Sequence, residues 1–352
     1  MVRITGNFQQ ERVLHPAASA LLTEFFAKGW SDPAKLNQQS RQSAILLQEA
    51  KESFANQLSV DSNEIEFLGE VDLGFQLGIQ GLLTERSKLI HSAIDRQKVF
   101  AVAKHVENMG RKTQVLSVNT HGVIEQPRTE PADVLVWQVV NGETGNTQPA
   151  PKAECKIFAD CTSSGVDLQA NFNYQTALFD SSSWAGPAGL GVFIIKSNTN
   201  WRNPLAHNDL VRVPNTFSLA LALASSVALE GYIKDEDIRS KLKKQIIESI
   251  SSQIKDIDIV SSPEGVSKYL SLSIKSIEAD RLLLDLEDKG FAVDSGSACK
   301  SADMQPSHVL AAMGRPISGN IRLTLHKDMT EEKVSNFCSA LKSSVEKLRG
   351  AN

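Results

Sequence analysis

The chain has 352 residues, 41% hydrophobic and 22% charged, with a formal net charge of −4. This composition is typical of a globular protein of about two domains, and the charge gives no electrostatic reason to expect binding to nucleic acid or to an anionic membrane. The four cysteines (Cys155, Cys161, Cys299 and Cys338) show no metal-ligand spacing, so neither a metal site nor a disulfide framework is predicted. The start, MVRITGNFQQ, lacks the apolar core of a signal peptide, and the most apolar helix is too short to span a bilayer, so we expect a cytoplasmic protein.

Helices are predicted at residues 17–29 and 40–58, where apolar residues recur at helical spacing. Seven apolar segments then alternate with helical or turn-rich stretches, at 64–68, 88–94, 114–118, 134–140, 156–160, 176–179 and 190–195. The segments VLVWQVV and GVFIIK are continuously apolar, as strands covered on both faces should be. The pattern predicts an α/β fold with a mostly parallel sheet and helices on both faces.

The pattern changes after residue 205. Here the sequence predicts helices at 217–230 and 234–254, strands at 268–274, 291–294 and 320–326, and a last helix capped by Asp328 or Thr330. One face of that helix is apolar and includes Cys338, which we interpret as a packing residue. We therefore expect a large α/β domain at 21–204 and a small C-terminal α+β domain at 205–352, with residues 1–20 packing on the small domain.

Cys299 lies in a run of small residues, DSGSACKSA at 294–302, between an apolar strand and a short helix. A Ser/Gly loop exposes such a thiol, and exposure with a lowered pKa makes a thiol reactive. The alternative is that a lone loop cysteine has no function. Arg322 alternates with the apolar residues of the strand at 320–326 and, judged by itself, would be a solvated charge.

The run SGSACKS, then QPSHVLAAMG, IRLTL and TEE, closely resembles the C-terminal half of the NifS-like cysteine desulfurases. These proteins belong to the class V branch of the fold-type-I enzymes that use pyridoxal phosphate (PLP). The resemblance implies that fold, a Cys299 that leaves the reaction as a persulfide, and an Arg322 that holds the substrate carboxylate. It extends more weakly over nearly the whole chain.

Four positions resemble the family's PLP-binding residues. Asn141 lies in a segment similar to the family's N-N-E-x-G-x-x-Q, and Asp160 matches the aspartate that pairs with the PLP ring nitrogen, although a strand-end aspartate often caps a helix instead. Thr216 is a further candidate. The segment LFDSSSWAGPAGLG resembles the family's S-x-H-K-x-x-G-P-x-G-x-G, which places Ser183 at the position of the PLP lysine.

That serine is the main departure from the family, because only an amine can form the Schiff base that holds PLP. The nearest following lysine, Lys196, lies at the far end of the next strand. The acids Glu70, Asp72 and Asp180 fall where the family binds the phosphate, and each close pair of like charges costs roughly 3 kcal/mol at about 5 Å. The alternative is a shifted alignment in which these acids are simply solvated.

Two further family positions are also changed. Arg96 stands where the family has the histidine that stacks on PLP, and Ser163 stands where it has a glutamine that bonds the cofactor's phenolic oxygen. These departures favour a protein that binds no cofactor.

Three functions stay open from the sequence. The first is a protein that has lost PLP and acts as a binding or regulatory partner, as a homodimer or as a heterodimer with an active paralogue. The second is an active PLP-dependent desulfurase that transfers sulfur from L-cysteine to Cys299. The third is a PLP-independent carrier of sulfur on Cys299, since thiol exchange needs only an accessible thiolate. The resemblance implies sulfur acceptors or iron–sulfur assembly proteins as partners.

Overall fold

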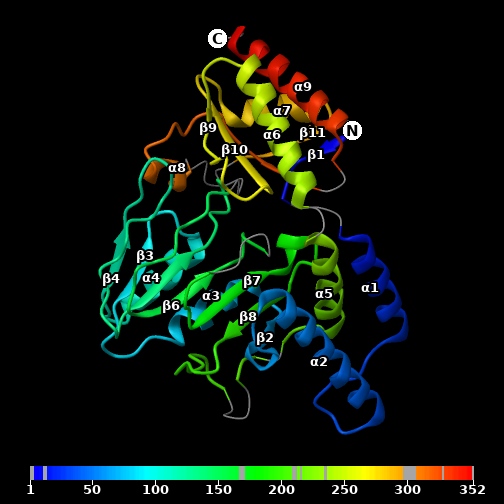
Figure 1. Cartoon of the computed structure of the whole chain (residues 1–352), viewed down its shortest axis with the longest axis vertical. Coiled ribbons are helices and arrows are strands. Elements are labelled where there is room, and N and C mark those ends of the chain that lie inside the picture. The colour runs from blue at the N-terminus through cyan, green and yellow to red at the C-terminus, as the bar shows by residue number, and fades with distance from the viewer. Residues whose placement is uncertain are drawn as a thin grey trace.

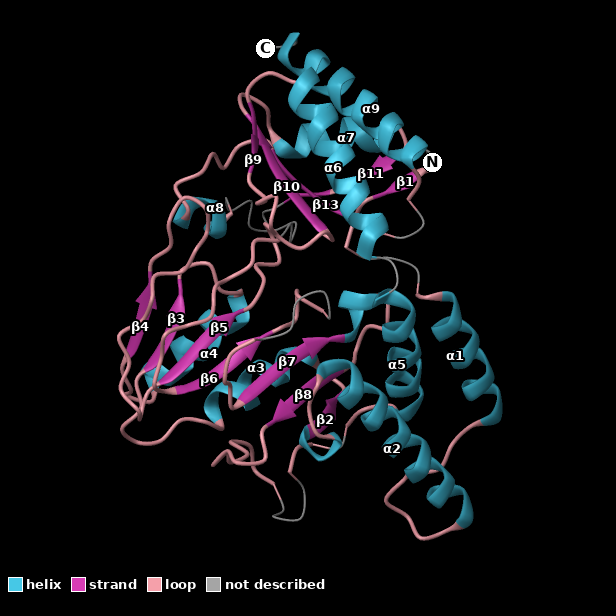
Figure 2. Cartoon of the chain, viewed as in Figure 1, coloured by secondary structure: helices cyan, strands magenta, loops and turns pink. Residues whose placement is uncertain are grey.

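The structure, a computed structural model, describes residues 4–10, 14–165, 171–207, 212–214, 216–233, 236–295, 307–326 and 329–350. It is an α/β protein in which a seven-stranded sheet and a smaller four-stranded sheet form two bodies, one above the other in Figures 1 and 2.

The large sheet contains all seven predicted strands: β2 (Ile65–Leu68), β3 (Leu89–Ser92), β4 (Thr113–Leu116), β5 (Val134–Gln138), β6 (Lys156–Asp160), β7 (Thr176–Asp180) and β8 (Gly191–Ile195). Their order is β2-β8-β7-β6-β5-β3-β4. Only β8 runs against the others, because its pairings with β7 and β2 are antiparallel and the rest are parallel. The prediction of a mostly parallel sheet is confirmed.

Helices cover both faces of this sheet, which explains the continuously apolar strands. On one face, α3 (Val71–Gln80) and α4 (Gln97–Asn108) pack on side chains such as Phe158 and Phe193. On the other, α2 (Gln38–Leu58) and α5 (Leu219–Ile233) pack on side chains such as Phe67 and Val192, and α1 (Pro16–Lys28) lies against α5. Figure 2 shows these two helical layers.

The small sheet has the order β12-β13-β10-β9 and is antiparallel. Its strands are β9 (Ile257–Ile259), β10 (Tyr269–Ile274), β12 (Asp294–Ser295) and β13 (Asn320–Thr324). The helices α6 (Glu236–Gln253), α7 (Ala279–Asp288) and α9 (Glu331–Gly350) share one apolar core with this sheet. The predicted strand at 291–294 is divided, because β11 (Phe291–Ala292) pairs instead with β1 (Gly6–Asn7).

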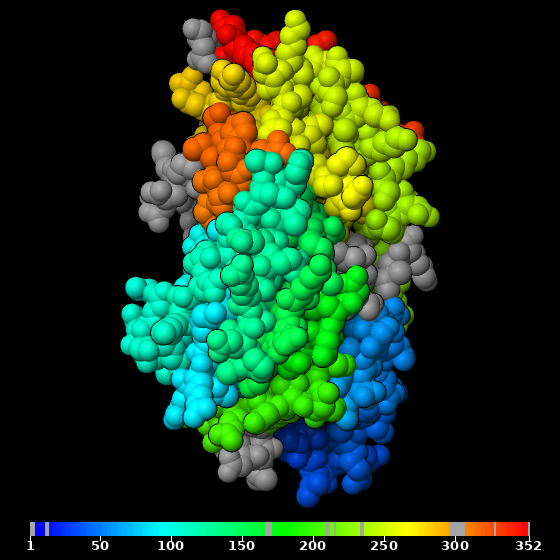
Figure 3. Space-filling model, turned by 60° about the vertical axis from the view of Figure 1, so that its left-hand side comes forward, coloured from blue at the N-terminus to red at the C-terminus, as the bar shows by residue number. Residues whose placement is uncertain are grey.

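Two features bear on the domain boundary. The pairing of β1 with β11 joins the N-terminus to the small sheet, whereas α5, beyond residue 205, packs on the large sheet. We therefore propose that the division falls between α5 and α6. The bodies also meet at α8 (His308–Ala312), whose Val309 and Leu310 pack on Leu116 and Ile124; Figure 3 shows this orange helix against the cyan and green residues.

Candidate functional site

The carboxyl ends of the parallel strands bring several predicted residues to one edge of the large sheet. Asp160 ends β6, Asp180 ends β7, and Ser183 follows in the 3-10 turn Ser181–Trp184. Asn141 follows β5 and is buried, where its side chain donates to Ile94 and Gln138 and accepts from the next turn. The positions of these strand ends are as the sequence predicted.

Asp160 is buried and is contacted by Arg96. Its Oδ1 atom accepts from the backbone N–H and the hydroxyl of Thr162, at 3.0 and 2.6 Å. Its Oδ2 atom lies 3.3 Å from Nε of Arg96. Neither of these two atoms makes a hydrogen bond within the described residues, so the contact is an ion pair without hydrogen-bond geometry.

Arg96 also donates from its terminal NH2 to the hydroxyl of Ser163. The two substituted positions of the resemblance therefore bind each other. Arg96 therefore places a permanent positive charge beside Asp160, because a guanidinium stays protonated in proteins.

Ser183 is buried, and its hydroxyl has no hydrogen-bond partner among the described residues. Its carbonyl oxygen accepts from the Nζ atom of Lys268 at 2.6 Å. Lys268 is only 2% exposed and comes from the loop before β10 of the small sheet. An amine is thus adjacent to the residue that the resemblance places at the family's lysine position, although it comes from another part of the chain.

Lys196 lies at the opposite edge of the sheet, as predicted. It directly follows the antiparallel strand β8, and its Nζ atom pairs with Oε2 of Glu64 at 2.6 Å, just before β2 begins. It is therefore remote from Asp160 and Ser183.

The acids near the expected phosphate position have partners of their own. Glu70 caps α3 by accepting from the backbone N–H of Asp72 at 3.2 Å, and Asp180 accepts from the N–H of Ser182 at 2.9 Å. Asp72 pairs with Lys98 at a half-exposed position, so its charge is partly neutralised within the chain.

Thr216 is exposed, and its backbone lies beside Gly69, between β2 and α3. Its carbonyl oxygen would lie 2.5 Å from a Cβ atom at Gly69, so only glycine fits there.

Arg322 lies on β13 and points away from the apolar core, as its strand position predicted. It donates to the carbonyl of Gly142 at 3.1 Å, to the side chain of Gln10 at 3.1 Å and to Asp294 at 2.9 Å. Its guanidinium already has a carboxylate partner within the chain.

Three cations act on the phenol of Tyr269, the first residue of β10, which is 1% exposed. Burial acts to raise the pKa of its phenol. The charges of Lys268, Arg322 and Arg96, with a hydrogen bond from Lys268, outweigh burial and hold this pKa below its ordinary value.

Two buried acids titrate at higher pH than usual. Burial, reinforced by the nearby Asp160, raises the pKa of Asp95 to about 8. Burial also raises the pKa of Glu143 to about 7, against the opposing effects of a hydrogen bond from Ser307 and the charge of Arg322. Both carboxyls are therefore wholly or partly protonated at neutral pH.

Cys299 lies outside the described residues. Among the other cysteines, Cys338 is buried in the core of the small domain, as predicted. Burial raises the pKa of Cys338 and of Cys155, which disfavours their reactive thiolate forms.

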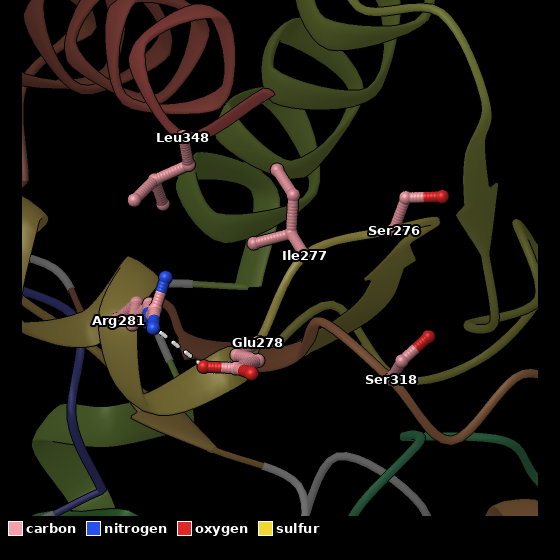
Figure 4. A pocket seen from close by; sticks show the side chains of 6 residues that line it. All are labelled: Ser276, Ile277, Glu278, Arg281, Ser318 and Leu348. Atoms are coloured by element: carbon pink, nitrogen blue, oxygen red, sulfur yellow. Dashed lines mark ion pairs between the residues drawn. The ribbon is translucent and has the colours of Figure 1, made fainter. Parts of the chain in front are cut away.

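Figure 4 shows a cavity of about 290 Å³ in the small domain, between α7 and α9. Its charged side chains, Glu278 and Arg281, pair with each other at 2.9 Å, and none of the predicted site residues lines it. Within the described ranges, no cluster of metal-ligating side chains is present and no helix is long and apolar enough to cross a membrane.

The sequence did not single out Lys268, Tyr269, Asp294 or Glu143 as functional residues. Nothing in a local pattern distinguishes a lysine before a strand from a surface lysine, and its partner Ser183 is 85 positions away. Asp95 could have been identified from the sequence, because it directly precedes Arg96 near the end of a predicted strand.

Comparisons with known proteins concern the family and the fold. Residues 210–337 match the family model of aminotransferase class V. A cysteine desulfurase of Nostoc sp. is 26% identical over 359 residues, which cover 93% of this chain and 88% of that protein. Cysteine desulfurase IscS of Clostridium botulinum is 25% identical and covers 92% of this chain and 90% of its own length.

The chain is thus similar to class V aminotransferases over residues 210–337 and to cysteine desulfurases over most of its length. Among solved structures, a NifS-like protein matches with a TM-score of 0.87 at 19% identity, over 99% of this chain and 100% of the other. A NifS-like protein of Rickettsia africae matches with a TM-score of 0.82 at 18% identity, over 98% and 100%. The predicted fold-type-I architecture of PLP enzymes is confirmed, and the matches support the predicted family.

Proposed function

We propose that this protein keeps the fold of a cysteine desulfurase but binds no PLP, and that it acts as a binding or regulatory partner or as a carrier of sulfur on Cys299. The observation that carries the proposal is the ion pair between Arg96 and Asp160. In the family this aspartate is the partner of the cofactor's ring nitrogen, and here a cation of the chain occupies that role.

The rest of the site supports the same conclusion, since the residues present do not fit PLP. Ser183 offers a hydroxyl at the lysine position. After β2 and β7, the backbone N–H groups of Asp72 and Ser182 are already hydrogen-bonded to the carboxylates of Glu70 and Asp180. A phosphate dianion there would meet acids in place of free donors.

The residue that would bind a substrate carboxylate also has a partner within the chain. Arg322, which the resemblance assigns to a substrate carboxylate, is paired with Asp294. An incoming amino acid would have to share this guanidinium with a carboxylate fixed on the neighbouring strand.

Carriage of sulfur on Cys299 needs none of these groups. The thiolate of Cys299 attacks the outer sulfur of a donor persulfide, the donor's S–S bond breaks, and the donor leaves as a thiolate while Cys299 becomes the persulfide. The sequence of the loop supports this role, and the carrier and partner roles differ only in whether Cys299 reacts.

An absorbance spectrum after incubation with PLP tests the loss of the cofactor. We expect no visible aldimine band, no PLP attached after borohydride reduction, and no sulfide released from L-cysteine above a blank. A yellow protein that borohydride reduces would overturn the proposal.

Labelling with a persulfide donor separates the carrier from the partner. A carrier is labelled on Cys299, and Cys299→Ala removes the label while Cys338→Ala keeps it. Equal labelling of the wild type and Cys299→Ala would eliminate the carrier and leave the binding role.

An active PLP-dependent cysteine desulfurase is the second candidate, and one observation favours it: the buried amine of Lys268 beside Ser183. If this amine held PLP, borohydride would attach the cofactor to Lys268, and Lys268→Arg would abolish both the attachment and the release of sulfide.

We propose that the protein forms a homodimer, or a heterodimer with an active paralogue, in the cytoplasm. Following the resemblance, sulfur acceptors or iron–sulfur assembly proteins are its proposed partners. Co-purification from cells that express both paralogues tests the heterodimer.

A further inference from the structure

We propose that Glu143 is a positioning residue that holds the C-terminal end of the segment containing Cys299 against the large domain, and that ionisation of Glu143 loosens this hold. The inference deepens the proposed function, on which it rests for the role of Cys299. It follows from described residues on either side of that segment, Asp294 before it and Ser307 after it. Both have contacts that lead to one turn of the large domain, the turn after β5.

The Ser307 end of the segment is bound by Glu143 itself. The hydroxyl of Ser307 donates to Oε1 of Glu143 at 2.6 Å and accepts from the backbone N–H of Leu310 at 3.1 Å. One hydroxyl therefore caps α8 and also attaches the start of this helix to the large domain. Ser307 and Glu143 are 3% and 8% exposed, so water does not compete for the contact.

The Asp294 end reaches the residue next to Glu143. Asp294 lies opposite Arg322 in the pairing of β12 with β13, and Arg322 donates to the Asp294 carboxylate at 2.9 Å and to the carbonyl of Gly142 at 3.1 Å. The side chain of Asn141 holds this turn by accepting from the backbone N–H of Glu143 at 3.0 Å. The two ends of the segment are therefore anchored at neighbouring residues of the large domain, and of these two only Glu143 titrates.

Charged and titratable groups lie around this turn on several elements, namely Arg96 at the start of α4, Tyr269 on β10, Asp294 on β12, His308 on α8 and Arg322 on β13. Among them, the charge of Arg322 acts to lower the pKa of Glu143, as does the hydrogen bond from Ser307. Burial outweighs both effects and raises this pKa to about 7. A negative charge on Glu143 therefore costs more in the buried contact than Ser307 and Arg322 offset.

The direction of the pH effect follows from this raised pKa. When the contact opens, water solvates the Glu143 carboxyl, and its pKa falls toward the ordinary value near 4. The closed contact binds the proton more tightly, so it is fully stabilised below about pH 4 and weakens as pH rises through about 7. Above that value Glu143 is ionised in both states, and it causes no further change.

Trypsin measures the opening, because Lys300 directly follows Cys299 and is the one lysine or arginine between Asp294 and Ser307. The rate of cleavage after Lys300 is divided by the rate for a peptide of residues 294–307, which removes the pH dependence of trypsin itself. Between about pH 5.5 and 7.5 this ratio should rise about tenfold or more in the wild type and then level off. Glu143→Gln keeps the shape and the acceptor oxygen without the charge, so its ratio should stay low at every pH.

Asp95→Asn is the matched control, because Asp95 is another buried carboxyl with a raised pKa at this edge of the sheet, about 8. This variant should keep the rise and its levelling near pH 7. Circular dichroism confirms that each variant is folded. An equal rise in folded Glu143→Gln, or loss of the rise in Asp95→Asn, would overturn the proposal.

Persulfide labelling of Cys299 tests the proposed function separately. An unlabelled Cys299 together with the rise in the cleavage ratio would remove the carrier role and support Glu143 as the positioning residue. A labelled Cys299 with a cleavage ratio that does not vary with pH would remove this inference alone.

Discussion

The Nζ atom of Lys268 lies 2.6 Å from the carbonyl oxygen of Ser183, so a lysine of the small domain contacts the backbone of the serine that the resemblance places at the family's lysine position. Together with the bond from Arg322 to Gly142, this contact joins the small sheet to the carboxyl edge of the large one. In both contacts a side chain of the small domain donates to a backbone carbonyl of the large domain.

Ser183→Lys alone should not restore PLP binding. The new amine would still face an Asp160 paired with Arg96, and the N–H groups near the phosphate position would still be bound by Glu70 and Asp180. We expect no aldimine band in the visible spectrum. A stable band in this single variant would mean that the acids do not exclude the phosphate.

Asp95→Asn should stabilise the protein at alkaline pH. Because burial raises the pKa of Asp95 to about 8, folding favours its protonated form, and the wild type loses stability as pH rises from about 4 through 8. Asparagine avoids this loss, so the variant should gain on the order of a few kcal/mol over the wild type at pH 8.5 relative to pH 5. Urea unfolding at the two values measures it. A difference that does not vary with pH would show that Asp95 does not titrate in this range.

Asp285→Asn should weaken the contact between α7 and α9. Asp285 pairs with Lys289 at 2.7 Å and also with Lys347, and these contacts hold the pKa of its carboxyl well below the usual range. The stabilisation is therefore present above the unfolded pKa near 4 and is lost as pH falls below it. Since Lys347 is mostly exposed, we expect a loss of about 1–2 kcal/mol at pH 7. A loss that is equally large at pH 3 would contradict the ionic origin.

Gly78→Ala should destabilise the large domain although alanine favours helices. A Cβ atom at this position of α3 would lie 2.3 Å from the ring of Phe158 under the sheet. We expect a loss of about 2 kcal/mol or more, which exceeds the gain in helix propensity of about 1 kcal/mol. Gly350→Ala, with nothing near its Cβ, is the matched control, and thermal unfolding compares the two.

Trp30→Glu should disrupt the proposed homodimer. Large apolar side chains are exposed around α1 and α2, namely Phe26, Trp30, Leu36 and Ile45, beside a cavity of about 530 Å³. An added charge on this face should lower the mass found by light scattering to that of one chain. Leu284→Glu, at an exposed site of the small domain, should leave the mass unchanged. The same mass for Trp30→Glu and the wild type would place the dimer contact elsewhere.

The amino-acid sequence by itself predicted the strands and the resemblance to the NifS-like cysteine desulfurases, and it shows that residue 183 has no amine. Continuous apolar segments such as 134–140 and 190–195 predict buried strands because each side chain there is covered whichever face it takes, and the motif around Cys299 is specific through its fixed spacings.

Only the tertiary structure decided which charges meet. Arg96 could be assigned to a substituted position from the sequence, but its approach to Asp160 depends on the alignment of β3 with β6 through β5. The contact of Lys268 with Ser183 depends on how two sheets pack, and electrostatic partners at that range are set by side-chain direction and burial, which local sequence does not encode.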